Sequence, residues 1–167
     1  MRVRPARRDE LSRVFELTYD LAESVSRTRH IVECKRNPKL RSGTHYVLED
    51  ADGQFLATMT AYRFAYPFVG TTIGLANFFV APAHRRRGLG RQLLAGALAD
   101  LEAGGERLFY LLSEIGGEYY EPFGFQELPI SYEMAPQCVP MLRCPDNDWP
   151  RLSQHRPYLL GLMAFVD

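Results

Sequence analysis

The sequence is poor in the features that mark several common protein classes. Among its 167 residues are three cysteines and one tryptophan, and its longest apolar run covers only residues 158–166. That run is too short to span a bilayer, and residues 1–5 contain no apolar signal segment. The cysteines, Cys34, Cys138 and Cys144, form no CxxC pair. We therefore expect a cytoplasmic protein without a disulfide framework, a metal site or a membrane segment.

An excess of charge of either sign is also absent. Twenty basic side chains balance twenty acidic ones, so the formal net charge is 0. Proteins that bind nucleic acids usually carry a basic excess, and we expect no such partner here. Apolar residues make up 46% of the chain, which is sufficient for one domain with a hydrophobic core.

Hydrophobic periodicity predicts a mixed α/β domain over residues 1–135. Strands are predicted at 1–4, 44–49, 54–64, 71–80, 107–112 and within 126–134, and helices at 8–24, 26–37, 88–103 and 118–120. The turn at 50–53 joins two strands into a hairpin. The continuously apolar strand 107–112 after helix 88–103 is typical of a parallel pair. Residues 136–167 read as a proline-punctuated extension that packs on the domain or on a partner chain.

One segment concentrates positive charge beside glycine where a strand ends and a helix begins. It contains four arginines and two glycines, namely Arg85, Arg86, Arg87, Arg91, Gly88 and Gly90. The first N–H groups of a helix lack helical partners and carry positive potential. Glycine lets the backbone approach a phosphate closely because no Cβ intervenes. The segment therefore predicts an anion site.

Two nucleotide-binding motifs do not fit this segment. A Walker A loop needs Lys-Ser/Thr after its last glycine, but Arg91-Gln92 follow Gly90. A dinucleotide-binding fingerprint needs a third glycine, and Leu93 occupies that position. The pattern that remains is Arg-x-x-Gly-x-Gly, formed by Arg85, Gly88 and Gly90.

This pattern, with a strand before it and a helix after it, resembles the hallmark of the GNAT acetyltransferase superfamily. Residues 119–125, Tyr-Tyr-Glu-Pro-Phe-Gly-Phe, are similar to a second family element, Tyr-x-x-x-Gly-Phe, after the fifth strand. The resemblance covers most of residues 1–134. It implies a GNAT-like fold, a mostly antiparallel sheet splayed into a V and flanked by helices, with acetyl-CoA as co-substrate.

The resemblance also implies where the cofactor lies. Backbone N–H groups of residues 86–91 would bind the pyrophosphate, and the backbone of Phe79 and Val80 would pair with the pantetheine arm. A bulge near Phe78 would aim an amide at the thioester carbonyl, as an oxyanion hole does. Ser113 stands where the family often has a cofactor-contacting Asn, seven residues before its tyrosine. The implied cofactor contacts are Phe78, Phe79, Val80, Arg85, Arg86, Arg87, Gly88, Leu89, Gly90, Arg91 and Ser113.

The implied reaction is direct attack of a primary amine on the thioester. Tyr120 stands four residues before Gly124, where the family keeps a tyrosine that protonates the leaving thiolate, and Tyr119 is the competing choice. Many members place a Glu on the strand before the loop, but this chain has Leu75, Ala76 and Asn77 there. Some base should help, because an amine with a pKa of about 10.4 is mostly protonated at neutral pH.

Other carboxylates are candidates for that base. Glu114, which follows the predicted strand 107–112, is the first of them, and Glu33 and Glu118 are weaker ones. The alternative for each of these three carboxylates is an exposed surface side chain with no role in catalysis.

For the acceptor amine and the oligomeric state, the sequence allows several interpretations. Phe64, Tyr66 and Phe68 would line an acceptor pocket or cover the sheet edge. The basic residues within 27–30 favour an acceptor that carries a carboxylate, such as an amino acid. A chain that lacks the strand Glu could instead be an acyl-CoA sensor without turnover. The apolar run 158–166 could add a strand or a homodimer contact, which would make the chain an interaction protein.

Overall fold

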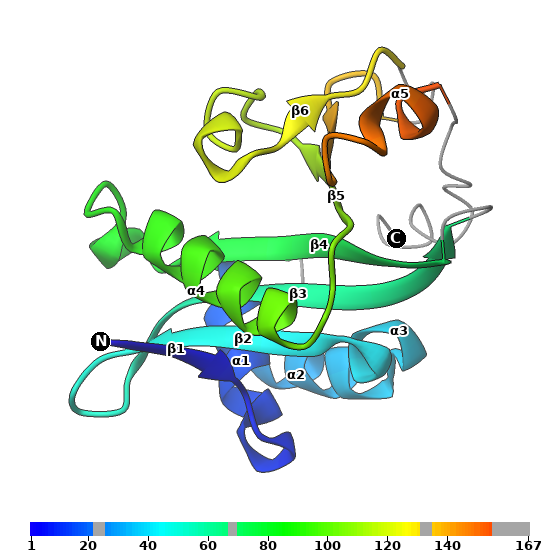
Figure 1. Cartoon of the computed structure of the whole chain (residues 1–167). Helices are drawn as coiled ribbons and strands as arrows, with labels where there is room; N and C mark the ends of the chain where they lie inside the picture. The colour runs from blue at the N-terminus through cyan, green and yellow to red at the C-terminus, as the bar shows by residue number, and fades with distance from the viewer. Residues whose placement is uncertain (22–25, 67–69, 131–134, 155–167) are drawn as a thin grey trace. The chain divides into compact units, whose positions relative to one another are not determined.

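The computed structural model describes residues 1–21, 26–66, 70–130 and 135–154 (Figure 1). Its strands form one seven-stranded sheet in the order β1-β2-β3-β4-β5-β7-β6, and helices accompany the sheet. This mixed, mostly antiparallel arrangement confirms the predicted fold class. The strands are β1 (Arg2–Pro5), β2 (Thr44–Glu49), β3 (Phe55–Tyr66), β4 (Gly70–Val80), β5 (Phe109–Ser113), β6 (Gln126–Glu127) and β7 (Val139–Arg143). The α-helices are α1 (Leu11–Leu17), α2 (Arg27–Arg36), α3 (Pro38–Ser42), α4 (Leu89–Ala103) and α5 (Trp149–Leu152), and the 3-10 helices are η1 (Arg8–Glu10), η2 (Thr18–Leu21), η3 (Pro82–His84) and η4 (Glu121–Phe123).

The chain folds into two compact units, between which β3 and β4 are divided. The first unit holds residues 1–62 and 76–103, and the second holds residues 63–75 and those from 104 onward.

Helices cover both faces of the strands in the first unit (Figure 1). Successive side chains of a strand point to opposite faces. The Tyr46 hydroxyl of β2 donates to Asp100 Oδ2 of α4 at 2.7 Å. The next residue, Val47, packs instead with Val14 and Phe15 of α1. Helix α4 therefore lies on one face of β2, and α1 lies on the other.

Helix α4 buries the apolar stripe that its sequence predicts. Its buried residues are Leu89, Gly90, Leu93, Leu94, Ala97, Leu98 and Leu101. The helix ends at Ala103, as predicted, before two glycines of which Gly105 has a φ of 94°. Gly96 faces β1 so closely that a Cβ there would lie 2.7 Å from the Cβ of Val3.

The single helix predicted over residues 8–24 is wrong. Residues 8–10 form η1, and α1 begins only at Leu11. The Glu10 carboxylate accepts from the Arg7 N–H at 2.8 Å, which caps η1 and fixes a separate first turn. At the other end, Thr18 Oγ1 donates to Phe15 O at 3.1 Å, and the chain tightens into η2. Residues 22–24 lie outside the described residues.

The second predicted helix is confirmed, but the structure following it was missed. Ser26 Oγ accepts from the Arg29 N–H at 3.3 Å and caps α2. Pro38 was predicted only to stop this helix. It also opens α3, because the fixed φ of proline suits a first helical turn and its missing N–H is not needed there. Asn37 Oδ1 caps α3 by accepting from the Lys39 N–H at 3.0 Å.

In the second unit, β5 lies between β4 and β7. It is parallel to β4, with Ile73 opposite Phe109 and Gly74 opposite Tyr110, which confirms the predicted parallel pair. It is antiparallel to β7 over its whole length. Residues 139–143, from the predicted extension, thus contribute a strand to the sheet.

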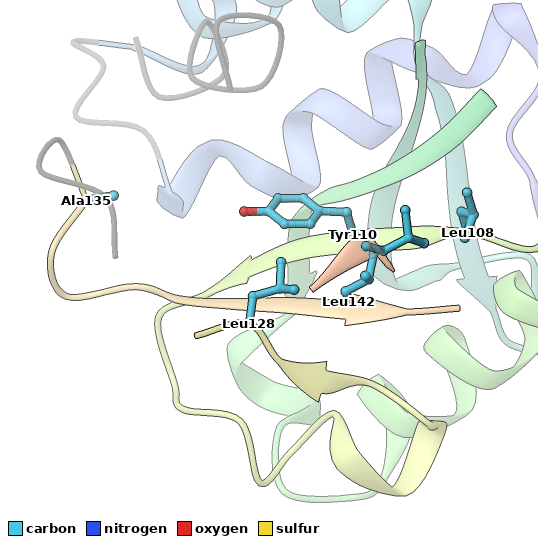
Figure 2. Packing of buried hydrophobic residues seen from close by; sticks show 6 residues of the cluster. Leu108, Tyr110, Leu128, Ala135 and Leu142 are labelled. Atoms are coloured by element: carbon cyan, nitrogen blue, oxygen red, sulfur yellow. The ribbon is translucent and has the colours of Figure 1, made fainter. Parts of the chain in front are cut away.

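The core of the second unit is a cluster of buried apolar side chains (Figure 2). Its members are Leu108, Tyr110, Leu128, Ala135, Leu142 and Leu152. Phe64 packs against this cluster, which favours a structural role over the predicted acceptor pocket. The side chains of Tyr66 and Phe68 lie outside the described ones.

The short helix predicted at residues 118–120 is wrong. Those residues form a turn, and the helix η4 covers Glu121–Phe123 instead. Pro122 was expected to end the helix, but it lies within the first turn of η4, where proline is tolerated. Tyr120 therefore directly precedes a helix rather than ending one.

Candidate functional site

The backbone between β4 and α4 turns through two left-handed residues. Arg86 has a φ of 59° and Gly88 a φ of 77°. The Gln92 N–H donates to Gly88 O at 3.0 Å, so the first turn of α4 starts directly after Gly88. The amides of that turn point out of the positive end of the helix. Left-handed residues in such a loop gather backbone N–H groups into a concave anion-binding nest.

Four arginine side chains surround this turn, and all four are exposed. They are Arg85, Arg86, Arg87 and Arg91. Arg85 Nε donates to Val80 O at 3.0 Å, and its guanidinium lies 5.4 Å from the centre of the Phe79 ring. Arg87 Nη1 lies 3.3 Å from His84 Nδ1. Arg85 thereby ties the loop to the end of β4, while the guanidinium groups remain accessible to an anion.

The end of β4 combines regular pairing with one irregular residue. The Ala81 N–H donates to Leu56 O of β3 at 3.0 Å. Phe79 is buried, and Phe78 and Val80 are half-buried. Asn77 has a φ of 51° in mid-strand. An irregularity is therefore present next to Phe78, where the bulge was predicted.

The conformation of Asn77 gives a physical reason for the missing strand carboxylate. Asn tolerates a left-handed backbone better than most residues, whereas a Glu with this φ would be strained. The Asn77 side chain turns toward β3, where its Nδ2 lies 3.2 Å from the Tyr62 hydroxyl and 3.4 Å from Thr60 Oγ1.

Asn77 also lines a cavity of about 180 Å³ within the first unit. The cavity is lined by Val14, Phe15, Thr18, His30, Cys34, Leu40, His45, Thr58, Thr60 and Asn77. None of these side chains carries a formal charge when the histidines are neutral. Sequence reasoning missed this cavity, because its residues come from seven separate elements and no spacing links them. The only available sign was two histidines and one cysteine without an assigned role.

In the second unit, the predicted acid Tyr120 is 7% exposed. Its ring centre lies 5.0 Å from that of Tyr119 and 6.0 Å from that of Phe125. Burial is the main cause that raises the pKa of the Tyr120 phenol to about 12. The phenol is therefore protonated at neutral pH and can donate a hydrogen bond.

The predicted bases are all exposed. Glu114 follows β5 directly, and Glu118 lies in the turn before Tyr120. Glu33 of α2 pairs with Arg29 at 2.7 Å.

Ser113 is buried and its hydroxyl closes a turn at the end of β5. It donates to Gly116 O at 2.6 Å and accepts from the Ile115 N–H at 3.2 Å. These bonds fix the chain that leads toward Tyr120. The predicted contact of Ser113 with a cofactor stays a prediction.

Two features are absent from residues 1–21, 26–66, 70–130 and 135–154. No group of three or more His, Cys, Asp or Glu side chains there is arranged to hold a metal ion. None of the helices in that part of the chain has the length and apolar character needed to cross a membrane.

Solved structures share this fold at low sequence identity. YhbS, a GNAT family N-acetyltransferase from Escherichia coli in complex with CoA, has a TM-score of 0.67 and 17% identity, over 88% of this chain and 82% of that one. A GNAT family acetyltransferase from Brucella melitensis in complex with acetyl-CoA has a TM-score of 0.55 and 24% identity, over 75% and 82%. Aminoglycoside 6'-acetyltransferase type Ii has a TM-score of 0.61 and 18% identity, over 86% and 97%.

The sequence itself gives the stronger evidence. The profile of the acetyltransferase (GNAT) domain family matches residues 2–128, which include both motifs and the loop before α4. The chain belongs to the GNAT acetyltransferase family.

Proposed function

We propose that this protein transfers the acetyl group of acetyl-CoA to a primary amine. The loop from Arg85 to Gly90 carries the proposal. It places two left-handed residues and exposed arginines at the positive end of a 15-residue helix, in a chain of an acetyltransferase family. Such a loop suits a pyrophosphate, because amides and guanidinium groups together neutralise its charge.

On the donor side, the N–H groups of residues 86–91 hold the pyrophosphate. The pantetheine arm pairs with the backbone of Phe79 and Val80, as an added strand would. The CoA and acetyl-CoA complexes of the Escherichia coli and Brucella melitensis proteins support this donor. Ser113 contributes by holding the turn that follows β5.

The chemical step is attack of the amine nitrogen on the thioester carbonyl carbon. The carbonyl oxygen gains charge, and the Phe78 amide donates to it. The carbon–sulfur bond then breaks, and the thiolate leaves with the electron pair. Tyr120 donates a hydrogen bond to that sulfur. Full proton transfer from a phenol with a pKa of about 12 to a thiolate with a pKa of about 8.5 is uphill by roughly 5 kcal/mol, so the phenol keeps its proton.

On the acceptor side, the cavity beneath α1 and α2 favours the neutral form of the amine. Moving an ammonium ion into a site without a counter-charge is costly, so the amine loses a proton on entering. The fold shared with aminoglycoside 6'-acetyltransferase type Ii supports an amine as the acceptor. Glu114 remains a candidate base at the solvent side. A cytoplasmic location is part of the proposal, since all three cysteines are free thiols.

A thiol-release assay tests the proposal. Purified protein is mixed with acetyl-CoA and separately with spermidine, an aminoglycoside, phenethylamine and free amino acids. Free thiol is measured, and the acetylated amine is identified by mass. Turnover on any amine with matching N-acetyl product supports the proposal.

Asn77 in place of a strand carboxylate favours a second candidate, an acyl-CoA sensor without turnover. Tight binding of acetyl-CoA, together with no thiol release on every amine of the panel, would replace the transferase with this sensor.

A further inference from the structure

A chain of hydrogen bonds runs from the backbone of α3 to the irregular residue of β4. His45 Nε2 lies 2.7 Å from Leu40 O, and His45 Nδ1 lies 3.1 Å from Thr60 Oγ1. Thr60 Oγ1 in turn lies 3.4 Å from Asn77 Nδ2. The chain ends one residue before Phe78.

The direction of each bond in this chain follows from its partners. A carbonyl oxygen can only accept, so His45 Nε2 carries the hydrogen that binds Leu40 O. In a neutral imidazole, Nδ1 is then a bare acceptor, and the Thr60 hydroxyl must donate to it. The remaining lone pairs of Thr60 Oγ1 can accept, which is why Asn77 presents its amide nitrogen.

The environment keeps the imidazole neutral and fixed. His45 is 4% exposed, and the ring of Phe15 meets its ring edge-on, with centres 5.3 Å apart. Burial lowers the pKa of His45, and the bond to Leu40 O partly opposes this. The titratable groups that face the cavity with His45 are His30 and Cys34 of α2. The Tyr62 hydroxyl of β3 is hydrogen-bonded to both Thr60 and Asn77. Helix α1 contributes Val14 and Phe15, and η2 contributes Thr18, all of which are uncharged.

We propose that Thr60 and His45 form the proton-accepting relay of the transferase, in place of the carboxylate that the strand lacks. This inference rests on the proposed function. Thr60 lines the cavity, and it contacts the side chain of Asn77, the residue before Phe78. An amine nitrogen held in the cavity can therefore donate its N–H to Thr60 Oγ1.

The step conserves protons and electrons. As the amine nitrogen bonds to the thioester carbon, its N–H proton passes to Thr60 Oγ1. The Thr60 hydroxyl proton passes at the same time to His45 Nδ1. The imidazolium that forms keeps its Nε2–H bond to Leu40 O, and it returns its proton through Thr60 to solvent after the product leaves. Thr60 touches the substrate, and His45 acts through it.

Two threonines of β3 make a matched pair of variants. Thr60 and Thr58 both line the cavity and are 2% and 1% exposed. The Thr58 hydroxyl, however, donates to the backbone oxygen of Tyr46 at 2.9 Å and lies outside the relay. We expect Thr60→Val to lower kcat about 10²-fold with little change in KM. Thr60→Ser keeps the hydroxyl and should have a kcat close to that of the wild type. Thr58→Val, at a cavity threonine outside the relay, should lower kcat less than Thr60→Val does.

The pH profile of kcat separates a relay from a structural role. In the wild type, kcat should fall as the pH drops through the pKa of His45, below 6.5, because protonated His45 cannot accept. The residual rates of Thr60→Val and of His45→Gln should lack this fall. The best amine of the thiol-release panel is the probe, and thermal melts check that each variant folds.

The outcomes distinguish this relay from the proposed function. Wild-type protein without turnover on any amine overturns both. Turnover with equal kcat in Thr60→Val and Thr58→Val, or an unchanged acid limb in the Thr60→Val and His45→Gln variants, overturns the relay alone.

Discussion

Among single residues, Glu10 has a carboxylate whose pKa is strongly lowered by its neighbours. Its side chain is 4% exposed, and the Arg4 guanidinium lies 2.7 Å away. Arg4 also reaches Glu49 of β2 at 2.6 Å, so one cation joins β1, η1 and β2. The hydrogen bond from Arg4 is the main cause that lowers the pKa of Glu10 from 4.5 to about 2.

Glu10→Gln should therefore destabilise the protein by about 2 kcal/mol at pH 7, because it leaves Arg4 with half of its buried partners. A carboxylate with a lowered folded-state pKa stabilises the fold above its unfolded value. The difference between wild type and variant should thus be full above pH 4.5 and disappear as the pH falls toward 2. Urea unfolding at a series of pH values measures it.

Asp9→Asn is the control for this experiment. Asp9 is 76% exposed and meets Arg7 only at 3.5 Å, so its loss should leave stability nearly unchanged. An equal effect of both substitutions would contradict a special role for the buried pair.

Tyr120→Phe should lower kcat about 10²-fold, because it removes the hydrogen bond to the leaving thiolate, with a smaller change in the KM for acetyl-CoA. The substitution keeps the aromatic packing against Tyr119 and Phe125 and removes only the hydroxyl. Steady-state kinetics with the best amine of the panel measures the effect. Tyr119→Phe is the matched control and should keep the wild-type kcat. The reverse pattern would assign the role to Tyr119.

At this scale the sequence predicts residues that belong to local motifs and misses those that depend on tertiary contacts. The loop from Arg85 to Gly90 has its glycines at fixed offsets, so its shape is encoded locally. The pairing of His45 with Thr60 depends on the register between β2 and β3, which no local pattern reports. From the sequence, Asn77 was only a position without the family's carboxylate. Its left-handed backbone conformation was not predicted, because the residue type alone does not determine it.

Among the elements, α4 packs closely against its neighbour β1 at Gly96, which has no side chain. Gly96→Ala places a Cβ within 3 Å of all three side-chain carbons of Val3. Overpacking typically destabilises a fold by about 1–3 kcal/mol. Alanine has a higher helix propensity than glycine, which offsets about 1 kcal/mol of that loss. We expect a net loss of about 1 kcal/mol in the free energy of unfolding, measured by urea titration.

A second substitution tests the cause of that loss. Val3→Ala removes carbons that the new methyl group meets. The double variant should therefore lose less free energy of unfolding than the sum of the two single losses. If the two single losses add up to the loss of the double variant, the contact with Val3 is not the cause of the destabilisation by Gly96→Ala.

The elements show why some predictions succeeded. Helix α4 and the β2–β3 hairpin have strong periodicity and turn residues at their ends, and both are confirmed. Strand β7 was not predicted because Pro140 lies within it and cannot donate an N–H to a neighbour. Its carbonyl is still used, since the Leu128 N–H donates to Pro140 O at 2.9 Å.

For the whole molecule, the apolar run at 158–166, which lies outside the described residues, has two predicted roles, packing on its own domain or a contact between two copies of the chain. Deleting residues 155–167 spares Leu152, which belongs to the core of the second unit. If the run joins two copies, light scattering over a concentration series should give a dimer for the full chain and a monomer for the shortened one. Leu160→Asp is the full-length control and should also give the monomer. An unchanged mass in both variants would exclude this dimer.

The central claim is that the loop before α4 binds acetyl-CoA, and calorimetric titration with acetyl-CoA tests it most directly. Gly88 and Gly105 both have a left-handed φ, 77° and 94°, and neither has an atom within 4 Å of an added Cβ. Alanine should therefore strain the backbone similarly at both sites, while only Gly88 lies in the proposed pyrophosphate loop. We predict that wild-type protein and Gly105→Ala bind acetyl-CoA alike and that Gly88→Ala binds at least about tenfold more weakly, a loss of about 1.4 kcal/mol. Wild-type protein that does not bind acetyl-CoA, or Gly88→Ala that binds it as Gly105→Ala does, would contradict the account.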